Sequence, residues 1–129
     1  MQTLPNLDRA VIAVEKLRDY VLNMEHPQGR HKAIVFKDLL GVETGHAEAF
    51  AEVIRGTLVR ALAQKRHTDN FGERWATYHE IIGLNGRPVF VTVAWMFRKE
   101  DPNIPVLISS YIELEQQEKL ARLRADEQK

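Results

Sequence analysis

Apolar residues recur at helical spacing through the first part of the chain. A helix is predicted over 13–23, where the apolar positions share one side: Val14, Leu17, Val21 and Leu22. Asn23 can end this helix, and a turn containing Pro27 and Gly29 follows it. A second helix is predicted over 30–40, because Gly41 follows an apolar stripe made of Ala33, Phe36 and Leu40.

A third helix is predicted over about 45–65, with Thr44 as its N-cap. Its apolar positions follow the spacing of a helix that faces a core: Phe50, Val53, Ile54, Leu58, Ala61 and Leu62. Gly56 lies inside the segment and lowers its helical propensity slightly. The first half of the chain is therefore predicted to be helical.

The second half of the chain has the apolar pattern of strands. Residues 74–82 are rich in aromatic and β-branched side chains, which predicts a strand. Asn85-Gly86 is a strong signal for a hairpin. Residues 88–98 are apolar on both faces, which predicts a central strand covered on two sides.

A last strand is predicted over 105–112, after a turn at 99–103, and a charged segment follows it. Residues 113–129 contain strong helix formers with a thin apolar stripe: Leu114, Leu120 and Leu123. Helices followed by a small antiparallel sheet define the α+β class. We therefore predict one α+β domain over 1–112, with N-terminal helices packed on the sheet, and a C-terminal helical tail over 113–129.

Composition restricts the classes of protein to which the chain can belong. Its 129 residues are 44% apolar and 28% charged, as is ordinary for one globular domain. The absence of cysteine excludes disulfides, thiolate zinc sites and a cysteine nucleophile. No apolar run approaches the roughly 20 residues that span a bilayer, and the N-terminus lacks the pattern of a secretory signal. We therefore expect a cytoplasmic protein without a membrane segment.

The charges of the chain cancel, since 18 Lys and Arg residues balance 18 Asp and Glu residues. This balance excludes a basic field over the whole chain, of the kind that coats nucleic acid. Two windows, 26–37 and 55–68, nevertheless contain basic residues and histidines and no acidic residue. Such windows can form local surfaces that bind anions.

The turn at 26–32 carries the first candidate site. It places His26, Arg30, His31 and Lys32 near the start of a helix, where free backbone N–H groups favour anions. Cations there are unfavourable for the helix itself, which suggests a phosphate ligand, and a histidine adds a general acid or base. The alternative is a solvated polar turn, which the residues alone favour slightly.

The last predicted strand carries a second candidate site, because Ser109 and Tyr111 share one face and hydroxyl groups there can bind phosphate. The alternative is a half-exposed strand, and Trp95 nearby is interpreted as a core residue. The five histidines lack the spacing of metal ligands and no nucleotide-cofactor motif occurs, so neither a metal nor a cofactor is expected. The window 55–68 is interpreted as a solvated helix face, or as the flank of a nucleic-acid groove.

Several short motifs, taken in order, resemble an uncharacterised bacterial domain family. They are Pro5-Asn6, Lys-Leu-x-x-Tyr-x-Leu at 16–22, His-Pro-x-Gly-x-x-Lys-x-x-x-Phe at 26–36 and Phe-Gly-Glu-Arg-Trp at 71–75. Further matches lie in the predicted hairpin and last strand: Asn85, Gly86, Arg87, Trp95, Pro105, Leu107, Ser109 and Tyr111. The resemblance covers about residues 4–112. Members of the family occur as small proteins and as domains of polymorphic toxins and phage-head-associated proteins.

The resemblance extends to the Barnase–EndoU–Colicin–RelE-like ribonuclease fold, in which helices precede an antiparallel sheet. Such ribonucleases work without metal and drive the ribose 2′-hydroxyl onto the adjacent phosphate. By this resemblance His26 would be the acid or base and Lys32 the phosphate clamp. Ser109 and Tyr111 would face the site from the last strand.

The resemblance also implies residues that bind the substrate. Arg74 would steer phosphate, and Arg30 and His31 would contribute further contacts, with His31 as an alternative working histidine. Some members have threonine where this chain has Val93, so a hydroxyl group is absent there.

The principal hypothesis is a metal-independent endoribonuclease of the toxin type, whose partners are RNA and a neutralising protein. The alternative is a catalytically inactive binding module on the same fold, such as an antitoxin, an immunity protein or a scaffold of a phage or secretion machine. The tail at 113–129 is a candidate contact for a homo-oligomer. The enzyme hypothesis predicts that His26, Lys32, Ser109 and Tyr111 converge on one open cleft.

Overall fold

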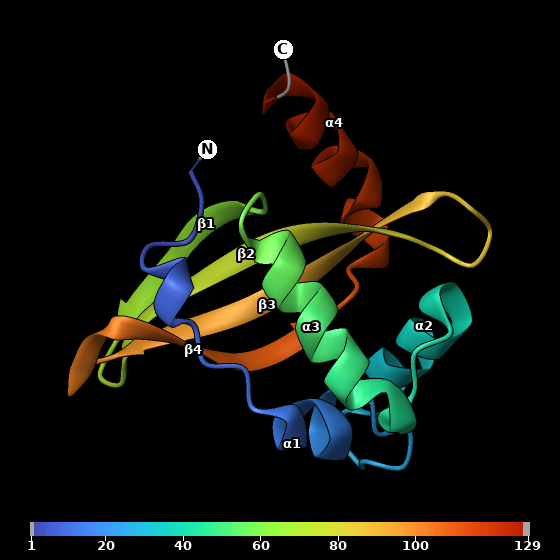
Figure 1. The fold of residues 1–129 in the computed structure, drawn as a ribbon, viewed down its shortest axis with the longest axis horizontal. Helices are drawn as coiled ribbons and strands as arrows, with labels where there is room; N and C mark the ends of the chain where they lie inside the picture. Colours follow the sequence, from blue (N-terminus) through green and yellow to red (C-terminus); the bar gives the residue numbers. More distant parts are fainter. Residues whose placement is uncertain (1, 128–129) are drawn as a thin grey trace.

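A four-stranded antiparallel sheet with the order β1-β2-β3-β4 forms the centre of the protein, here a computed structural model that describes residues 2–127 (Figure 1). The strands are β1 (Leu62–Asp69), β2 (Gly72–Ile82), β3 (Pro88–Arg98) and β4 (Asp101–Tyr111). Each strand pairs with the next along the chain. Helices precede the sheet and one follows it, so the predicted α+β class is confirmed.

The helices before the sheet are short, and α3 crosses one face of the sheet while α1 and α2 lie near one end of α3 (Figure 1). They are the 3-10 turn η1 (Leu7–Arg9), α1 (Val14–Lys16), the π-helical turn η2 (Leu17–Val21), α2 (Arg30–Leu40), the 3-10 turn η3 (Thr44–His46) and α3 (Ala47–Leu58). After the sheet follow the 3-10 turn η4 (Leu114–Gln116) and α4 (Gln117–Glu127).

The main core lies between α3 and the face of the sheet that α3 covers. On β3 this face presents alternate residues, all buried: Val89, Val91, Val93, Trp95 and Phe97. Ile54 and Leu58 of α3 and Phe36 of α2 belong to the same cluster. The prediction that Trp95 is a core residue is therefore confirmed.

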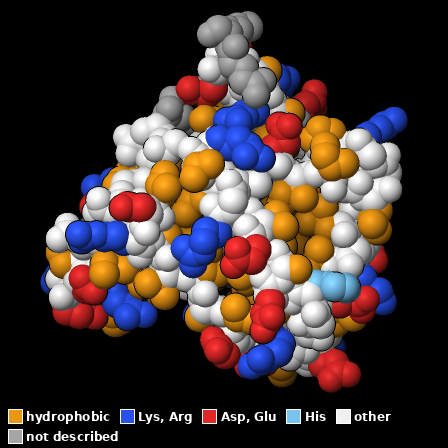
Figure 2. All heavy atoms as spheres, in the orientation of Figure 1, with side chains coloured by type: hydrophobic (Ala, Val, Ile, Leu, Met, Phe, Trp, Pro, Cys, Tyr) orange, Lys and Arg blue, Asp and Glu red, His pale blue; other side chains and the backbone are white. Residues whose placement is uncertain are grey.

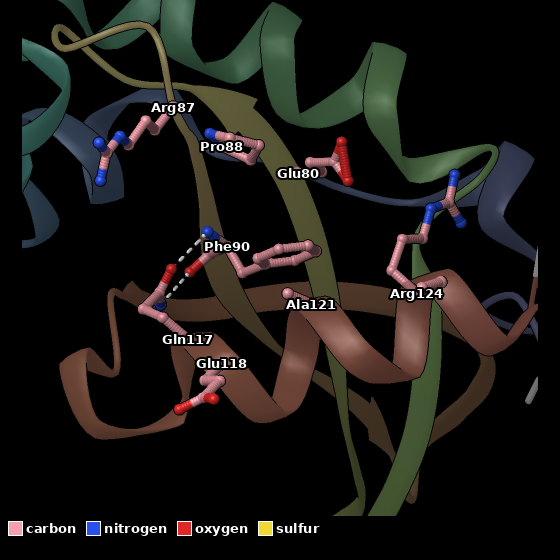
Figure 3. Close-up of a pocket in the computed structure, with 9 residues that line it drawn as sticks. Glu80, Arg87, Pro88, Phe90, Gln117, Glu118, Ala121 and Arg124 are labelled. Atoms are coloured by element: carbon pink, nitrogen blue, oxygen red, sulfur yellow. Dashed lines mark hydrogen bonds between the residues drawn. The ribbon is translucent and has the colours of Figure 1, made fainter.

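The opposite face of the sheet is covered in part by α4. Leu120 of α4 packs on Phe90 and Tyr78, so the predicted central strand is covered on two sides there. The Gln117 side chain accepts the backbone N–H of Phe90 at 2.7 Å and donates to its carbonyl oxygen at 2.9 Å (Figure 3). Farther along the face, Ala94 and Tyr111 are only partly buried, so α4 leaves this part of the sheet open.

The prediction of a helix up to residue 65 is wrong, because α3 ends at Leu58 and Leu62–Asp69 forms β1. Leu62 and Ala63 are buried, whereas residues 64–68 are exposed, so the strand shows no alternation of apolar residues. Charged side chains are typical of an edge strand such as β1. Pairing with β2, rather than a local pattern, therefore determines its conformation.

Two other predicted boundaries differ from the structure. The predicted turn at 99–103 is shorter, because β4 already begins at Asp101 and includes Pro102, which an edge strand tolerates. The predicted helix over 13–23 consists of one α-helical turn followed by the π-helical turn. The division into a domain over 1–112 and a tail stays a prediction.

Candidate functional site

The open part of the sheet is hollowed into a pocket of about 230 Å³, which we call the bulge pocket. Ala76 of β2 and Ala94 of β3 lie directly opposite each other and line it. Their small side chains leave space between the larger residues of the outer strands, among which Ile108 and Tyr111 of β4 also line the pocket. The pocket therefore lies across the middle of the sheet.

A β-bulge at Arg66 shapes one side of this pocket. Lys65 pairs with Trp75 and His67 pairs with Arg74, so Arg66 is the extra residue of β1. On a regular strand, neighbouring side chains point to opposite faces. Here Arg66 and His67 both line the pocket, because the bulge changes the direction of the strand.

A second irregularity lies on the other edge strand. Leu107 pairs with Trp95 and Ser109 with Ala94, so Ile108 is the extra residue of β4. Ile108 lines the bulge pocket, as Arg66 does from the opposite edge. Bulges are frequent next to active sites, where they reorient side chains.

Two basic side chains of the pocket meet around one carboxylate. Arg74 donates its Nε–H to Asp69 Oδ2 at 2.9 Å, and His67 Nε2 lies 3.6 Å from the same oxygen. Hydrogen bonds from Arg74 and from the Phe71 backbone N–H lower the pKa of Asp69. Asp69 therefore stays ionised and orients Arg74, and its Oδ2 atom lies within ion-pair distance of His67 when that ring is protonated. Within residues 2–127, the other side-chain N–H groups of Arg74 make no hydrogen bond.

Lys32 of α2 reaches Tyr111 at the edge of the pocket. Its Nζ atom lies 4.8 Å from the centre of the Tyr111 ring, in the geometry of a cation–π contact. Burial and the nearby Glu113 carboxylate raise the pKa of Tyr111, so its phenol keeps its proton at neutral pH. The contact brings a cation and an O–H donor together.

Of the residues predicted for the site, two line the bulge pocket and a third contacts one of them. Arg74 and Tyr111 line it, and Lys32 contacts Tyr111. Ser109 shares the face of Tyr111, since these residues pair with Ala94 and Thr92, but it does not line the pocket. Its catalytic role stays a prediction.

The histidine turn contributes no residue to the lining of the bulge pocket. His26 Nδ1 accepts the backbone N–H groups of Gln28 and Gly29, both at 3.1 Å, and its ring meets that of Tyr20 edge-on. Within residues 2–127, no hydrogen bond or ring contact joins His26 to the pocket. The Nδ1 lone pair therefore stabilises the turn, and the predicted roles of His26 and of the exposed Arg30 and His31 stay predictions.

Sequence reasoning missed Arg66 and His67 as pocket residues. The apolar period predicts a helix there, and even an expected strand would place these neighbours on opposite faces. The run Lys65-Arg66-His67 is visible as a basic window, but its bulge depends on the register with β2. Val93 is the position at which some family members have threonine. It lies outside this pocket, because its side chain is fully buried on the α3 face.

Two other hollows, near α3 and beside α4, offer less chemistry. An apolar hollow of about 240 Å³ lies between α3, the end of α2 and the end of β2, on the face seen in Figure 2. A larger one, about 650 Å³, lies beside α4, with Arg87 and Arg124 toward opposite ends (Figure 3). In neither do several cations converge. Within residues 2–127, no helix is long and apolar enough to cross a membrane, and no cluster of three or more His, Cys, Asp or Glu residues could hold a metal ion.

Comparisons with known proteins bear on the fold and the family. A family model described as a domain of unknown function (DUF6883) matches residues 3–114. No curated protein matches the chain. A similar solved structure is a chain of a contact-dependent growth inhibition toxin–immunity protein complex from Klebsiella pneumoniae 342. Its TM-score is 0.54 at 14% identity, over 84% of this chain and 97% of that chain, which shows a shared fold.

Proposed function

The chain belongs to the DUF6883 family, and we propose that it is an endoribonuclease of the toxin type. The bulge pocket carries this proposal, because Arg66, His67 and Arg74 converge there beside Tyr111. Guanidinium groups suit the planar, bidentate recognition of phosphate oxygens. The similar solved structure comes from a toxin–immunity complex, which agrees with a toxin and a neutralising protein partner.

The proposed reaction is an internal transfer of phosphate. The ribose 2′-oxygen attacks phosphorus and forms a P–O2′ bond, while the P–O5′ bond breaks. One group takes the 2′-hydroxyl proton and another gives a proton to the leaving 5′-oxygen. The products are a 2′,3′-cyclic phosphate and a 5′-hydroxyl end, so the atoms balance without a cofactor or a metal.

In this reaction the cations stabilise the crowded phosphate, whose negative charge increases in the transition state. Arg74 keeps its predicted role at the phosphate and acts with Arg66, while Lys32 adds a cation at the edge of the pocket. His67, whose Nε2 atom lies 3.6 Å from Asp69 Oδ2, takes the acid–base role that the resemblance assigned to His26. Tyr111 supplies an O–H donor.

Purified protein and a labelled RNA oligonucleotide in EDTA test the proposal. Wild type should produce 2′,3′-cyclic phosphate ends, and a 2′-deoxy substitution at the cleaved position should abolish the product. His67→Ala should lower the rate about 10²–10⁴-fold, and Arg74→Gln should lower it strongly. Arg87→Gln, an exposed arginine of the β2–β3 turn, serves as the matched control and should cleave normally.

The resemblance and the pocket make different predictions for the two histidines. His26→Asn keeps a side-chain oxygen that can accept the turn N–H groups, so folding should survive. A loss of activity in His26→Asn but not in His67→Ala would return the catalytic role to His26. A folded wild type that leaves every RNA intact would overturn the enzyme proposal.

The second candidate function is the inactive binding module, since the similar structure comes from a complex that contains an immunity protein as well as a toxin. Such a module should bind a protein partner and leave RNA uncut. The tail remains the predicted contact for a homo-oligomer. Its Leu114 is exposed, whereas Leu120 packs on the chain's own sheet.

A further inference from the structure

A second pocket, of about 390 Å³, lies between α4 and β1, and we call it the helix-side pocket. Arg66 lines both this pocket and the bulge pocket, so the two hollows are neighbours. Burial raises the pKa of Tyr78, and the charges of Arg66 and Glu113 also act on this phenol and on that of Tyr111. The polar groups of the two pockets therefore face a shared region.

The helix-side pocket combines an acceptor with donors. The Glu113 carboxylate is acceptor-only when ionised, and the Thr92 hydroxyl donates to its Oε1 at 2.9 Å, which holds it in place. Arg66 and Lys119 line the same pocket and are donors only. The Tyr78 hydroxyl donates to Gln64 Oε1 at 2.9 Å, so the Gln64 amide has a fixed orientation.

Apolar side chains complete the pocket. Leu120 and Leu123 of α4 line it, with the Tyr78 ring across from them on the sheet. Its volume lies in the range of small-molecule sites, about 300–1,000 Å³, and its lining is more polar than that of most such sites. A flat, partly apolar group with both donors and acceptors at its edge fits this description.

We infer that the helix-side pocket binds the base next to the cleaved phosphate and prefers guanine, an inference that rests on the proposed function. Guanine carries adjacent N1–H and N2–H donors, which match the Glu113 carboxylate. Its O6 and N7 acceptors suit Arg66 and Lys119, since arginine and lysine are the usual partners of these atoms. Adenine presents an acceptor at N1, which a carboxylate repels.

Arg66 lies where the two pockets meet and links a base site to a phosphate site. A base and its own phosphate are joined by one ribose, so their binding sites must be adjacent. The bulge pocket is cationic and small, as a phosphate site should be, and the helix-side pocket is larger and lies next to it. Arg66 at their junction can contact both parts of one nucleotide.

Calorimetric titration of the four ribonucleoside 3′-monophosphates into the whole protein tests the inference. The guanosine compound should bind about tenfold more tightly than the others, because one good bidentate pair discriminates by roughly this factor. Glu113→Gln should remove the preference while phosphate binding remains. Glu115→Gln, an exposed residue of the 3-10 turn that follows Glu113, is the matched control and should keep it.

A second variant keeps the test valid if Glu113→Gln fails to fold. Lys119 is exposed, so Lys119→Met should fold normally and still weaken guanosine 3′-monophosphate selectively. Equal affinity for all four compounds would overturn the inference, as would an unchanged guanine preference in both variants.

RNA cleavage separates this inference from the proposed function. Cleavage with no preference for guanosine at the cut position would overturn the guanine pocket and leave the nuclease intact. Selective binding of guanosine 3′-monophosphate without any cleavage would support the pocket and overturn the nuclease. Cleavage after guanosine that becomes indiscriminate in Glu113→Gln would support both.

Discussion

The Nδ1 atom of His79 lies 2.7 Å from the hydroxyl oxygen of Thr57, and this contact joins the sheet to α3. The Thr57 hydroxyl donates to the Val53 carbonyl at 2.7 Å, so it accepts the proton of His79 Nδ1. On the other side, Thr77 lies 2.7 Å from His79 Nε2 and accepts the Trp95 indole N–H at 2.8 Å. A neutral His79 with its proton on Nδ1 therefore gives every polar group of this buried hydrogen-bond network a partner.

Stability should fall in mild acid because of His79. Burial lowers its pKa from 6.5 to about 3, so the unfolded chain binds a proton below pH 6.5 that the folded chain does not. As the pH falls from 6.5 toward 3, the free energy of unfolding should decrease by about 1.4 kcal/mol per pH unit. Urea unfolding at pH 7, 6, 5 and 4 measures this slope, and His79→Gln should reduce it. A slope equal in both proteins would refute this explanation.

Thr77→Val should destabilise the protein by about 1–3 kcal/mol. The substitution keeps the shape of the side chain but leaves the Trp95 indole N–H and His79 Nε2 buried without partners. Thr68→Val, on the exposed part of β1, is the matched control and should change stability by less than about 0.5 kcal/mol. Equal effects of the two substitutions would contradict the proposed network.

Two glycine substitutions should have opposite effects. Gly72 has a φ of +145°, and a Cβ atom there would collide with the Phe97 carbonyl oxygen, so Gly72→Ala should destabilise the sheet. Gly56 lies inside α3 with open space around it, so Gly56→Ala should stabilise the protein by about 0.5–1 kcal/mol. Thermal unfolding of both variants measures the two signs.

Gln117→Leu should speed hydrogen–deuterium exchange of backbone N–H groups in the first part of β3. The last residue of β4 pairs with Thr92, so the Phe90 backbone extends beyond β4, and Gln117 supplies its hydrogen bonds. Without the amide, the Phe90 N–H should exchange with deuterium faster, while the Val93 N–H in the paired region keeps its protection. Unchanged exchange at Phe90 would show that α4 docks without this contact.

Lys32→Ala should lower the rate of RNA cleavage, since Lys32 is the cation held over Tyr111. Lys37→Ala, on the same helix and exposed, removes an equal charge away from Tyr111 and should cleave at the wild-type rate. Comparison of the two variants at several salt concentrations separates a local contact from a general effect of charge. Equal losses would assign the effect to net charge.

The elements with a regular apolar period could be predicted from the chain. The helix at 30–40, the hairpin at Asn85-Gly86 and the central strand at 88–98 occur as expected, because each buries a face that its own residues define. The same reasoning placed Ser109 and Tyr111 on one face of β4. The basic turn singled out Lys32, which contacts Tyr111, and the family motifs added Arg74, which lines the bulge pocket with Tyr111.

The conformation of β1 and the shape of the candidate site depend on how the strands pair. β1 has exposed polar residues along most of its length and takes its conformation from β2, so no local period marks it. The bulges at Arg66 and Ile108 exist because the registers shift between neighbouring strands. The sequence by itself determines the elements that bury a face of their own. The candidate site depends instead on contacts between segments that are distant in sequence, and these contacts form only when the strands pair over the core.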